Sequence, residues 1–182
     1  ELQTPPTCDP KLLDALPDSE KRKELAEIVD ATNRHVPQLG SISEPSVVSH
    51  TDLNTSNVLW SDNEPCLIDW DEAGPAYYSL DVVSTAMMWC RSAERTLDAE
   101  AYGSFLSHYR KRYNGPYELN TSFALWHTLG WGLDWLAYNL GHIQSQPSAS
   151  NEATKYHRAA ALQTDLVIST HSQKDIIQNV AS

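Results

Sequence analysis

The sequence predicts an α+β fold that is mostly α. Four long segments in its second part carry apolar residues at helical spacing: 79–93, 97–113, 121–144 and 151–172. Short apolar runs of strand length precede them, separated by polar turn residues. The chain has 182 residues, of which 41% are hydrophobic and 20% charged, which is enough to bury a core. We therefore expect a single domain over residues 1–182, with a small β region joined to a helical body.

The first elements follow from proline placement and capping residues. Residues 1–17 contain several prolines and predict a connector. Residues 18–46 predict a helix to about residue 35 and then a loop from Pro37 to Pro45. Asp18 or Ser19 can cap this helix, and its apolar residues recur at helical spacing: Leu25, Ile28 and Val29.

Residues 47–71 predict the β region, with apolar runs at 47–48, 58–60 and 66–68. If the last two runs pair as a hairpin with its turn centred near Asn63, paired positions sum to about 126. Asn57 would then face Asp69 at the open end of the hairpin, beside the loop that carries Asp52. We expect these three oxygen-bearing side chains to lie close together.

These residue types suit metal-assisted phosphoryl transfer. The amide oxygen of Asn57 and the carboxylate of Asp69 are ligands that Mg²⁺ prefers. Asp52 would remain free to orient an incoming hydroxyl or to accept its proton. A strong base is not required for this role, because the hydroxyl loses its proton late in a loose transition state.

The segment 79–182 predicts a helical subdomain, and its helix at 121–144 is apolar on two sides. One side carries residues expected in the core: Trp126, Leu129, Leu133, Leu136, Leu140 and Ile143. The other side carries a second stripe, with Asp134 beside it: Trp131, Trp135, Tyr138 and His142. This stripe is either buried against the last helix or binds a cationic acceptor through cation–π contacts and carboxylate pairing.

Charge and cysteine content limit the partners and the compartment. Thirteen Lys and Arg against 24 Asp and Glu give a net charge of −11, which excludes a nucleic-acid backbone as a partner. The acidity favours cationic ligands or simply solubility. The three cysteines form no CxxC pair, and no apolar run reaches the ~20 residues of a membrane span. We expect a cytoplasmic protein with no membrane partner.

The pattern His50-x-Asp52-x4-Asn57, followed by Asp69-Trp70-Asp71, resembles the catalytic and metal-binding loops of the protein-kinase-like superfamily. The run Leu67-Ile68-Asp69-Trp70 followed by Asp71 is similar to its small-molecule branch, the aminoglycoside phosphotransferase and choline kinase-like family. Thr51 departs from the Arg of many protein kinases and from the Gly usual in the small-molecule branch. The resemblance in sequence is strong over residues 47–83. Elsewhere only the predicted arrangement of secondary structure is similar to the family.

The resemblance implies the helical carboxy-terminal lobe of a kinase-like fold. It implies Asp52 as catalytic base, Asn57 and Asp69 as ligands of Mg²⁺ and nucleotide, His50 as a support of the loop, and Asp81 as a structural residue. The implied reaction transfers the γ-phosphate of ATP, or of GTP, to a hydroxyl of a small cationic acceptor. Candidate acceptor contacts are Asp71, Asp134, Trp131 and Trp135.

We find neither the Gly-rich phosphate loop nor the strand Lys that such kinases also use. The single G-x-G, at Gly130 and Gly132, lies in a helical setting. We therefore expect the amino-terminal nucleotide lobe to be absent from residues 1–182, and these residues alone to be inactive. A non-catalytic kinase-like binding or regulatory module is the alternative function, and choline, homoserine or a sugar are alternative acceptors.

Overall fold

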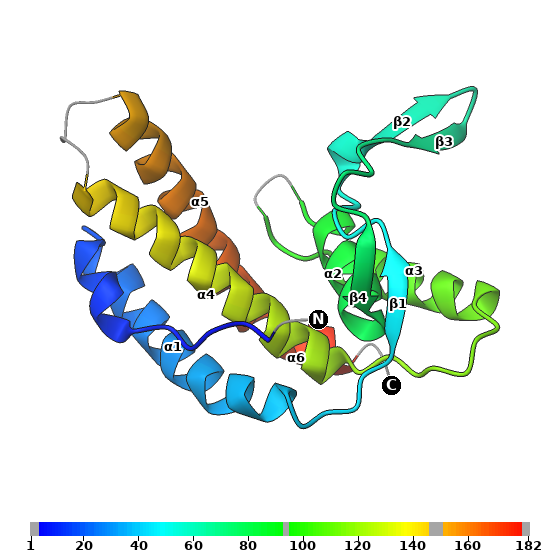
Figure 1. The fold of residues 1–182 in the computed structure, drawn as a ribbon, viewed down its shortest axis with the longest axis horizontal. Coiled ribbons are helices and arrows are strands. Elements are labelled where there is room, and N and C mark those ends of the chain that lie inside the picture. The colour runs from blue at the N-terminus through cyan, green and yellow to red at the C-terminus, as the bar shows by residue number, and fades with distance from the viewer. Residues whose placement is uncertain (1–3, 93–94, 146–150, 180–182) are drawn as a thin grey trace. The chain divides into compact units, whose positions relative to one another are not determined.

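The computed structural model describes residues 4–92, 95–145 and 151–179 (Figure 1). Contacts divide the chain into two compact units. The first comprises Glu1–Gln3, Ser43–Leu125 and Asp175–Ser182, and the second comprises Thr4–Ile42 and Trp126–Lys174. Helix α4 (Thr121–Ser145) begins in the first unit and continues into the second.

Two short antiparallel sheets lie in the first unit. Strand β1 (Ser46–Ser49) pairs with β4 (Gly74–Tyr77), so that Ser46 is opposite Tyr77. Strand β2 (Val58–Ser61) pairs with β3 (Glu64–Leu67) as a hairpin. The 3-10 turn η2 (Thr55–Asn57) leads directly into β2. The loop between β1 and η2 therefore begins at one sheet and ends at the other.

Helices of the first unit hold this loop in place. They are α2 (Tyr78–Trp89), α3 (Ala99–Arg112), the beginning of α4, and α6 (Lys174–Asn179). Their core consists of fully or nearly fully buried side chains: Val83, Ala86, Tyr102, Leu106, Phe123 and Ile177. The indole N–H of Trp89, at the end of α2, donates to the backbone oxygen of Leu53 at 2.7 Å. This bond ties the loop after β1 to the helical core.

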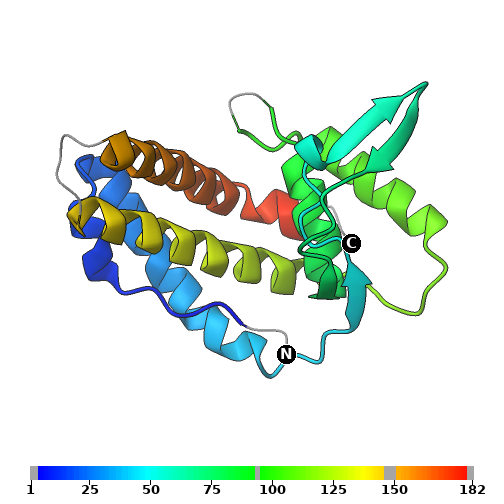
Figure 2. The same cartoon turned by 45° about the horizontal axis from the view of Figure 1, so that its top comes forward.

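The second unit is a helical bundle. Its elements are the 3-10 helix η1 (Pro10–Ala15), α1 (Ser19–Leu39), most of α4, and α5 (Asn151–Ser172). Figures 1 and 2 show α4 lying beside α5, with α1 packed along them. The apolar faces of these helices meet in a core that includes Leu25, Ile28, Val29, Leu129, Leu133, Leu136, Leu140 and Val167. Within the described residues, no helix combines the length and the apolar character needed to span a membrane.

The main helices and the three predicted strands are confirmed. Asp18 caps α1, as predicted, because its carboxylate accepts from the backbone N–H groups of Glu20 and Lys21. The expected end of this helix was wrong, since α1 continues through Pro37 to Leu39. Both Val36 and Leu39 are buried, and their burial favours the extra turn despite the hydrogen bond that proline cannot donate.

Other differences lie in short elements. Strand β4, η1 and α6 were not predicted. Strand β4 has the sequence Gly-Pro-Ala-Tyr, whose Gly and Pro indicate a turn rather than a strand. It forms a strand because it pairs with β1 from a distant part of the chain. The predicted loop at 146–148 lies outside the described residues.

Candidate active site

His50 joins the loop after β1 to the hairpin strand. Its side chain is buried, with 5% of its surface exposed, and its Nε2 lies 2.8 Å from the backbone oxygen of Ile68. The carbonyl can only accept, so Nε2 carries the proton in this bond. The imidazole also lies against the indole of Trp70, with ring centroids 4.7 Å apart. His50 therefore holds the two parts of the site together by a hydrogen bond and a ring contact.

Thr51 adopts a backbone conformation that β-branched residues rarely take. Its φ is 62°, in the left-handed region. Its hydroxyl donates to the backbone oxygen of Glu72 at 2.6 Å, and its N–H donates to the hydroxyl of Ser49 at 3.2 Å. The Ser49 hydroxyl in turn donates to the carboxylate of Asp81 in the first turn of α2. Hydrogen bonds thus stabilise a strained turn immediately before Asp52.

The carboxylate of Asp52 is oriented by two amide side chains. Asn54 Nδ2 donates to Oδ1 at 3.0 Å, and Asn57 Nδ2 donates to Oδ2 at 2.9 Å. Asn57 Nδ2 also donates to the backbone oxygen of Asp52 at 2.9 Å. A carboxylate has about four acceptor positions, so these bonds fix its orientation and leave others for a ligand. Asp52 itself is exposed to solvent.

Asn57 combines burial with an acceptor that no described residue uses. Only 7% of its surface is exposed, and both hydrogen bonds of its amide nitrogen go to Asp52. These bonds assign the nitrogen to the side of Asp52, so the amide oxygen points to the other side of the group. Among the described residues, none donates a hydrogen bond to this oxygen. The oxygen is therefore suited to a ligand such as a hard cation.

Asp69 also lies in the left-handed region, with φ of 64°. The bonds that surround it are from Ile68 N to Asn57 O at 3.0 Å, and from the Trp70 indole to Leu67 O at 3.0 Å. Non-glycine residues held in this conformation cluster at functional sites. Asp69 directly follows a residue that is hydrogen-bonded to Asn57, so the backbone brings the two candidate ligands to adjacent positions of the hairpin end.

The predicted register of the hairpin was wrong by one residue. Ser61 pairs with Glu64 and Val58 with Leu67, so Asn57 lies opposite Ile68 rather than Asp69. The turn is formed by Asp62 and Asn63, both with positive φ, which is the two-residue turn that matches the twist of antiparallel strands. This shorter turn shifts the pairing and leaves Asp69 just beyond the last paired residue.

The predicted acceptor residues lie in both units. Asp71 is exposed and directly follows Asp69 and Trp70 in the first unit. Trp131, Asp134 and Trp135 lie on the part of α4 that belongs to the second unit. Trp131 and Trp135 are not buried, since they are 38% and 54% exposed. Tyr138 and His142 of the same stripe do contact the last long helix, because their rings lie against Tyr156 of α5. The opposite face of α4 is buried as predicted from Trp126 to Leu140, whereas Ile143 is only partly buried.

Two features of the site were not predicted. Asn54 holds the Asp52 carboxylate and also caps η2, because its side-chain oxygen accepts from the backbone N–H of Ser56. The spacing of Asn54 and Ser56 is typical of such a capping turn and is a signal that could have identified it. The hydrogen bond from the Thr51 hydroxyl to Glu72 O joins residues far apart in the sequence, so no local sequence pattern indicates it.

No group of three or more His, Cys, Asp and Glu side chains that could hold a metal occurs within the part of the chain that the structure describes. The pair Asn57 and Asp69 has a different composition, namely one amide and one carboxylate. Such a pair suits Mg²⁺, which keeps several waters and binds the phosphates of a substrate in addition to one or two protein ligands.

Comparison with known families gives a match that covers the loop of His50 to Asn57 and the hairpin with Asp69. The APH family model, described as the Phosphotransferase enzyme family, matches residues 2–114, which is more than half of the chain. Comparison with curated proteins gives no match. The matched range includes β1, the loop from His50 to Asn57, the β2–β3 hairpin and Asp69. The chain therefore belongs to the Phosphotransferase enzyme family.

Proposed function

We propose that this protein transfers the γ-phosphate of ATP or GTP to a hydroxyl group of a small, cationic acceptor. The observation that carries the proposal is the arrangement around Asp52. Its carboxylate is held by the amides of Asn54 and Asn57, and the Asn57 amide oxygen accepts from no described residue. Membership of the Phosphotransferase enzyme family supports the same class of reaction.

In this proposal Asp52 orients the acceptor hydroxyl and accepts its proton. The two amide donors keep both carboxylate oxygens in a fixed plane at 2.9 and 3.0 Å, so little ordering remains to be done when the acceptor binds. Phosphoryl transfer depends mainly on positioning and charge neutralisation, which makes an oriented carboxylate an adequate base. Because Asp52 is exposed, an acceptor can reach it.

Asn57 and Asp69 would hold Mg²⁺ together with the nucleotide phosphates. The donor set fits, since one amide oxygen and one carboxylate are hard ligands. Bound Mg²⁺ would supply neutralisation of the charge on the β- and γ-phosphates. His50 would keep these ligands in place through its bond to Ile68 O at 2.8 Å, one residue before Asp69.

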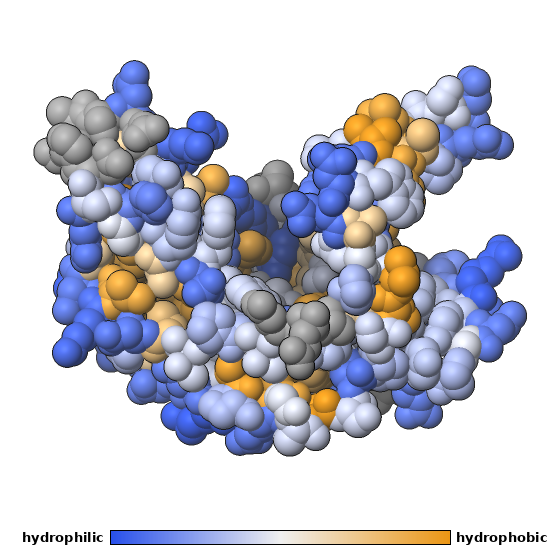
Figure 3. All heavy atoms as spheres, in the orientation of Figure 1, coloured by the Kyte–Doolittle hydropathy of each residue, from blue (hydrophilic) through white to orange (hydrophobic). Residues whose placement is uncertain are grey.

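A nucleotide lobe is expected to pack against the hairpin. Several apolar side chains on and around the hairpin are exposed: Val48, Leu59, Trp60, Leu67, Ile68 and Trp70. Figure 3 shows this apolar surface on the hairpin. A group of exposed apolar side chains of this kind favours contact with another element. We assign that role to a nucleotide-binding lobe outside residues 4–179.

The acceptor class follows from charge and aromatic exposure. The chain carries a net charge of −11, which favours cationic ligands. In the first unit, Asp71 is the candidate contact nearest in sequence to the proposed metal ligands. The second unit separately offers the exposed aromatic faces of Trp131 and Trp135 and the carboxylate of Asp134. Aminoglycosides, choline-like amines and amino alcohols are acceptors of this class.

The test is a phosphoryl-transfer assay of the full gene product with ATP or GTP and a panel of amines, amino alcohols and aminoglycosides. Asp52→Asn should lower turnover by about 10²- to 10⁴-fold, the usual contribution of a general base. The matched control is Asp62→Asn at the tip of the hairpin, which removes the same charge and keeps a residue that tolerates its φ of 52°. Equal turnover of the two variants would refute the role of Asp52.

A further inference from the structure

Trp89, the last residue of α2, contacts the loop directly beside Asp52. Its side chain is half-buried, and its indole N–H donates to the backbone oxygen of Leu53 at 2.7 Å. The two residues lie 36 positions apart in the sequence, so only the folded chain brings them together. Leu53 follows Asp52 in the chain. The bond therefore acts one residue away from the carboxylate that we propose as the base.

The peptide unit that joins Leu53 to Asn54 is hydrogen-bonded on both of its edges. Its carbonyl accepts from Trp89, and its N–H, which belongs to Asn54, donates to the backbone oxygen of Asp52 at 2.9 Å. A peptide unit is planar, so these two bonds fix the orientation of one rigid plane. Without the indole N–H, the plane would be held from the Asp52 side alone and could rotate.

The orientation of this plane decides where the Asn54 side chain lies. Asn54 Nδ2 donates to Asp52 Oδ1 at 3.0 Å, while Asn54 Oδ1 accepts from the backbone N–H of Ser56 at 2.8 Å. A rotation of the Leu53–Asn54 plane would move the Asn54 amide away from Asp52 Oδ1. The bond from Trp89 is thus connected to the Asp52 carboxylate through one peptide unit and one side-chain amide.

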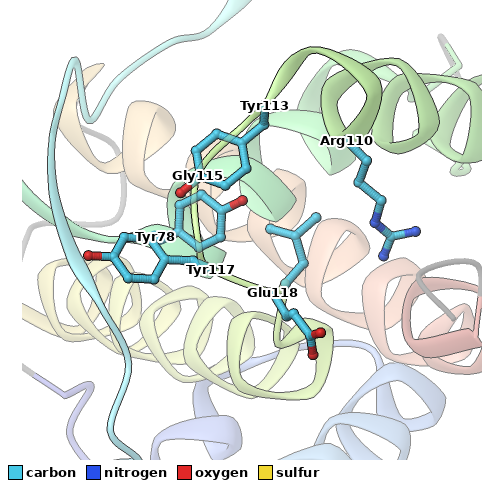
Figure 4. A pocket seen from close by; sticks show the side chains of 7 residues that line it. Tyr78, Arg110, Tyr113, Gly115, Tyr117 and Glu118 are labelled. Atoms are coloured by element: carbon cyan, nitrogen blue, oxygen red, sulfur yellow. The ribbon is translucent and has the colours of Figure 1, made fainter.

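Helix α2 is a rigid support for Trp89. In the middle of the helix, Val83 is fully buried in the core of the first unit. At its beginning, Tyr78 is 3% exposed, and its ring centroid lies 5.1 Å from that of Tyr113 and 5.5 Å from that of Tyr117 (Figure 4). Side chains on a close-packed helix position their partners more precisely than side chains on a loop.

We propose that Trp89 is a positioning residue for phosphoryl transfer, which acts on Asp52 through the Leu53–Asn54 peptide unit. The inference rests on the proposed function, because it requires Asp52 to orient the acceptor hydroxyl. The indole bonds to the backbone and not to the Asp52 carboxylate, so Trp89 takes no part in the proton transfer itself. Its loss should therefore lower the rate of the chemical step and leave the binding of nucleotide nearly unchanged.

The test compares Trp89→Phe with Trp126→Phe in the phosphoryl-transfer assay of the full gene product. Both variants keep an aromatic ring and lose an indole N–H, but Trp126 is a buried residue of the second unit. Trp89→Phe should lower kcat by about 10- to 100-fold with little change in the KM for nucleotide, because a displacement of about 1 Å is enough for such a loss. Trp126→Phe should lower stability and leave kcat unchanged. Equal kcat values in the two variants would overturn the proposal.

Hydrogen exchange measured by magnetic resonance tests the same bond without an activity readout. Trp89→Phe should speed exchange of the Asn54 backbone N–H by about tenfold, and leave that of Leu106 in the core of the same unit unchanged, which identifies a local effect. In the unsubstituted protein, the Trp89 indole N–H should exchange more slowly than that of Trp60, which is 63% exposed. Equal exchange of the two indoles would overturn the proposal even if Trp89→Phe does not fold.

Asp52→Asn distinguishes failure of this inference from failure of the proposed function. If Asp52→Asn keeps full turnover, the proposed base is wrong, and the role of Trp89 is overturned with it. If Asp52→Asn loses turnover while Trp89→Phe behaves like Trp126→Phe, the proposed function stands and the role of Trp89 alone is overturned. Faster exchange at Asn54 in Trp89→Phe with an unchanged kcat would also overturn it, because the bond would then hold the loop without affecting the base.

Discussion

The loop of residues 49–57 and the core of the second unit are stabilised in different ways. In the loop, individual hydrogen bonds hold the buried His50, the strained Thr51 and the exposed Asp52. In the second unit, Leu25 and Leu133 are at most 1% exposed and are held by close packing. The loop is thus sensitive to the position of single atoms, whereas the core is sensitive to volume. We therefore expect substitutions in the loop to change function more than stability, and substitutions in the core to change stability more than function.

The largest effect on stability is expected in the core. Leu25→Ala should lower the free energy of unfolding by about 2–5 kcal/mol, because it removes buried methyl groups and leaves a cavity. Urea unfolding measures this loss, and nucleotide binding by the remaining folded protein should be unchanged. Leu25→Met keeps the volume and should cost less than about 1.5 kcal/mol. An equal loss in both variants would show that packing at Leu25 is not the cause.

A smaller loss is expected at His50. His50→Ala removes the donor to Ile68 O at 2.8 Å and should lower the free energy of unfolding by about 1–3 kcal/mol. It should also weaken Mg²⁺-nucleotide binding, since Asp69 follows Ile68 directly. His108→Ala, an exposed histidine of the same unit, is the control and should stay within about 0.5 kcal/mol of the parent. If the two variants behave alike, His50 does not hold the loop.

At Thr51 two effects oppose each other. Thr51→Ala loses the hydroxyl bond to Glu72 O and keeps the strained φ of 62°, so it should cost about 0.5–1.5 kcal/mol. Thr51→Gly loses the same bond but relieves about 1 kcal/mol of strain, so its stability should lie near that of the parent. Thermal unfolding of the three proteins measures the difference. A glycine variant as unstable as the alanine variant would contradict the strain argument.

The smallest effect is expected at the surface pair Lys21 and Asp165, whose charged atoms lie 2.7 Å apart. Asp165→Asn should cost at most about 0.5 kcal/mol, because both side chains are exposed. The hydrogen bond that Lys21 Nζ donates to the Asp165 carboxylate raises the pKa of Lys21 above its ordinary value of 10.5. The contribution of the pair is therefore fully present below that value and is lost as the pH rises through the raised pKa.

Urea unfolding at about pH 8 and about pH 11.5 tests the sign of this dependence. The difference between the parent and Asp165→Asn should shrink at the higher pH. A difference that grows with pH would contradict the assignment of the pair.

Local patterns predicted the long helices, while long-range contacts decided what was missed. The cap of Asp18 and the buried face of α4 follow from spacing within one helix. Strand β4 forms only because β1 pairs with it, and the hairpin register depends on a turn of two left-handed residues, Asp62 and Asn63. Neither feature has a periodic signal in the sequence.

The motif from His50 to Asp69 predicted the order of the site residues but not the bonds that hold them. The contacts of Asn54 with Asp52 and of Thr51 with Glu72 depend on the folded path of the loop. The fold likewise brings the rings of Tyr78 and Tyr117 to 5.5 Å between centroids, although no short motif connects these residues. The sequence alone could not decide whether Trp131 and Trp135 are exposed. When a helix is apolar on two sides, either side can be buried or exposed to solvent.

The most direct test of the account is where a divalent ion binds with nucleotide. Mn²⁺ in place of Mg²⁺, added with ATP to isotopically labelled protein, broadens the magnetic resonance signals of nearby residues. We predict broadening centred on the side chain of Asn57 and on Asp69, and its loss in Asp69→Ala. Broadening centred elsewhere, or unchanged in Asp69→Ala, would contradict the assignment of this pair as the metal site.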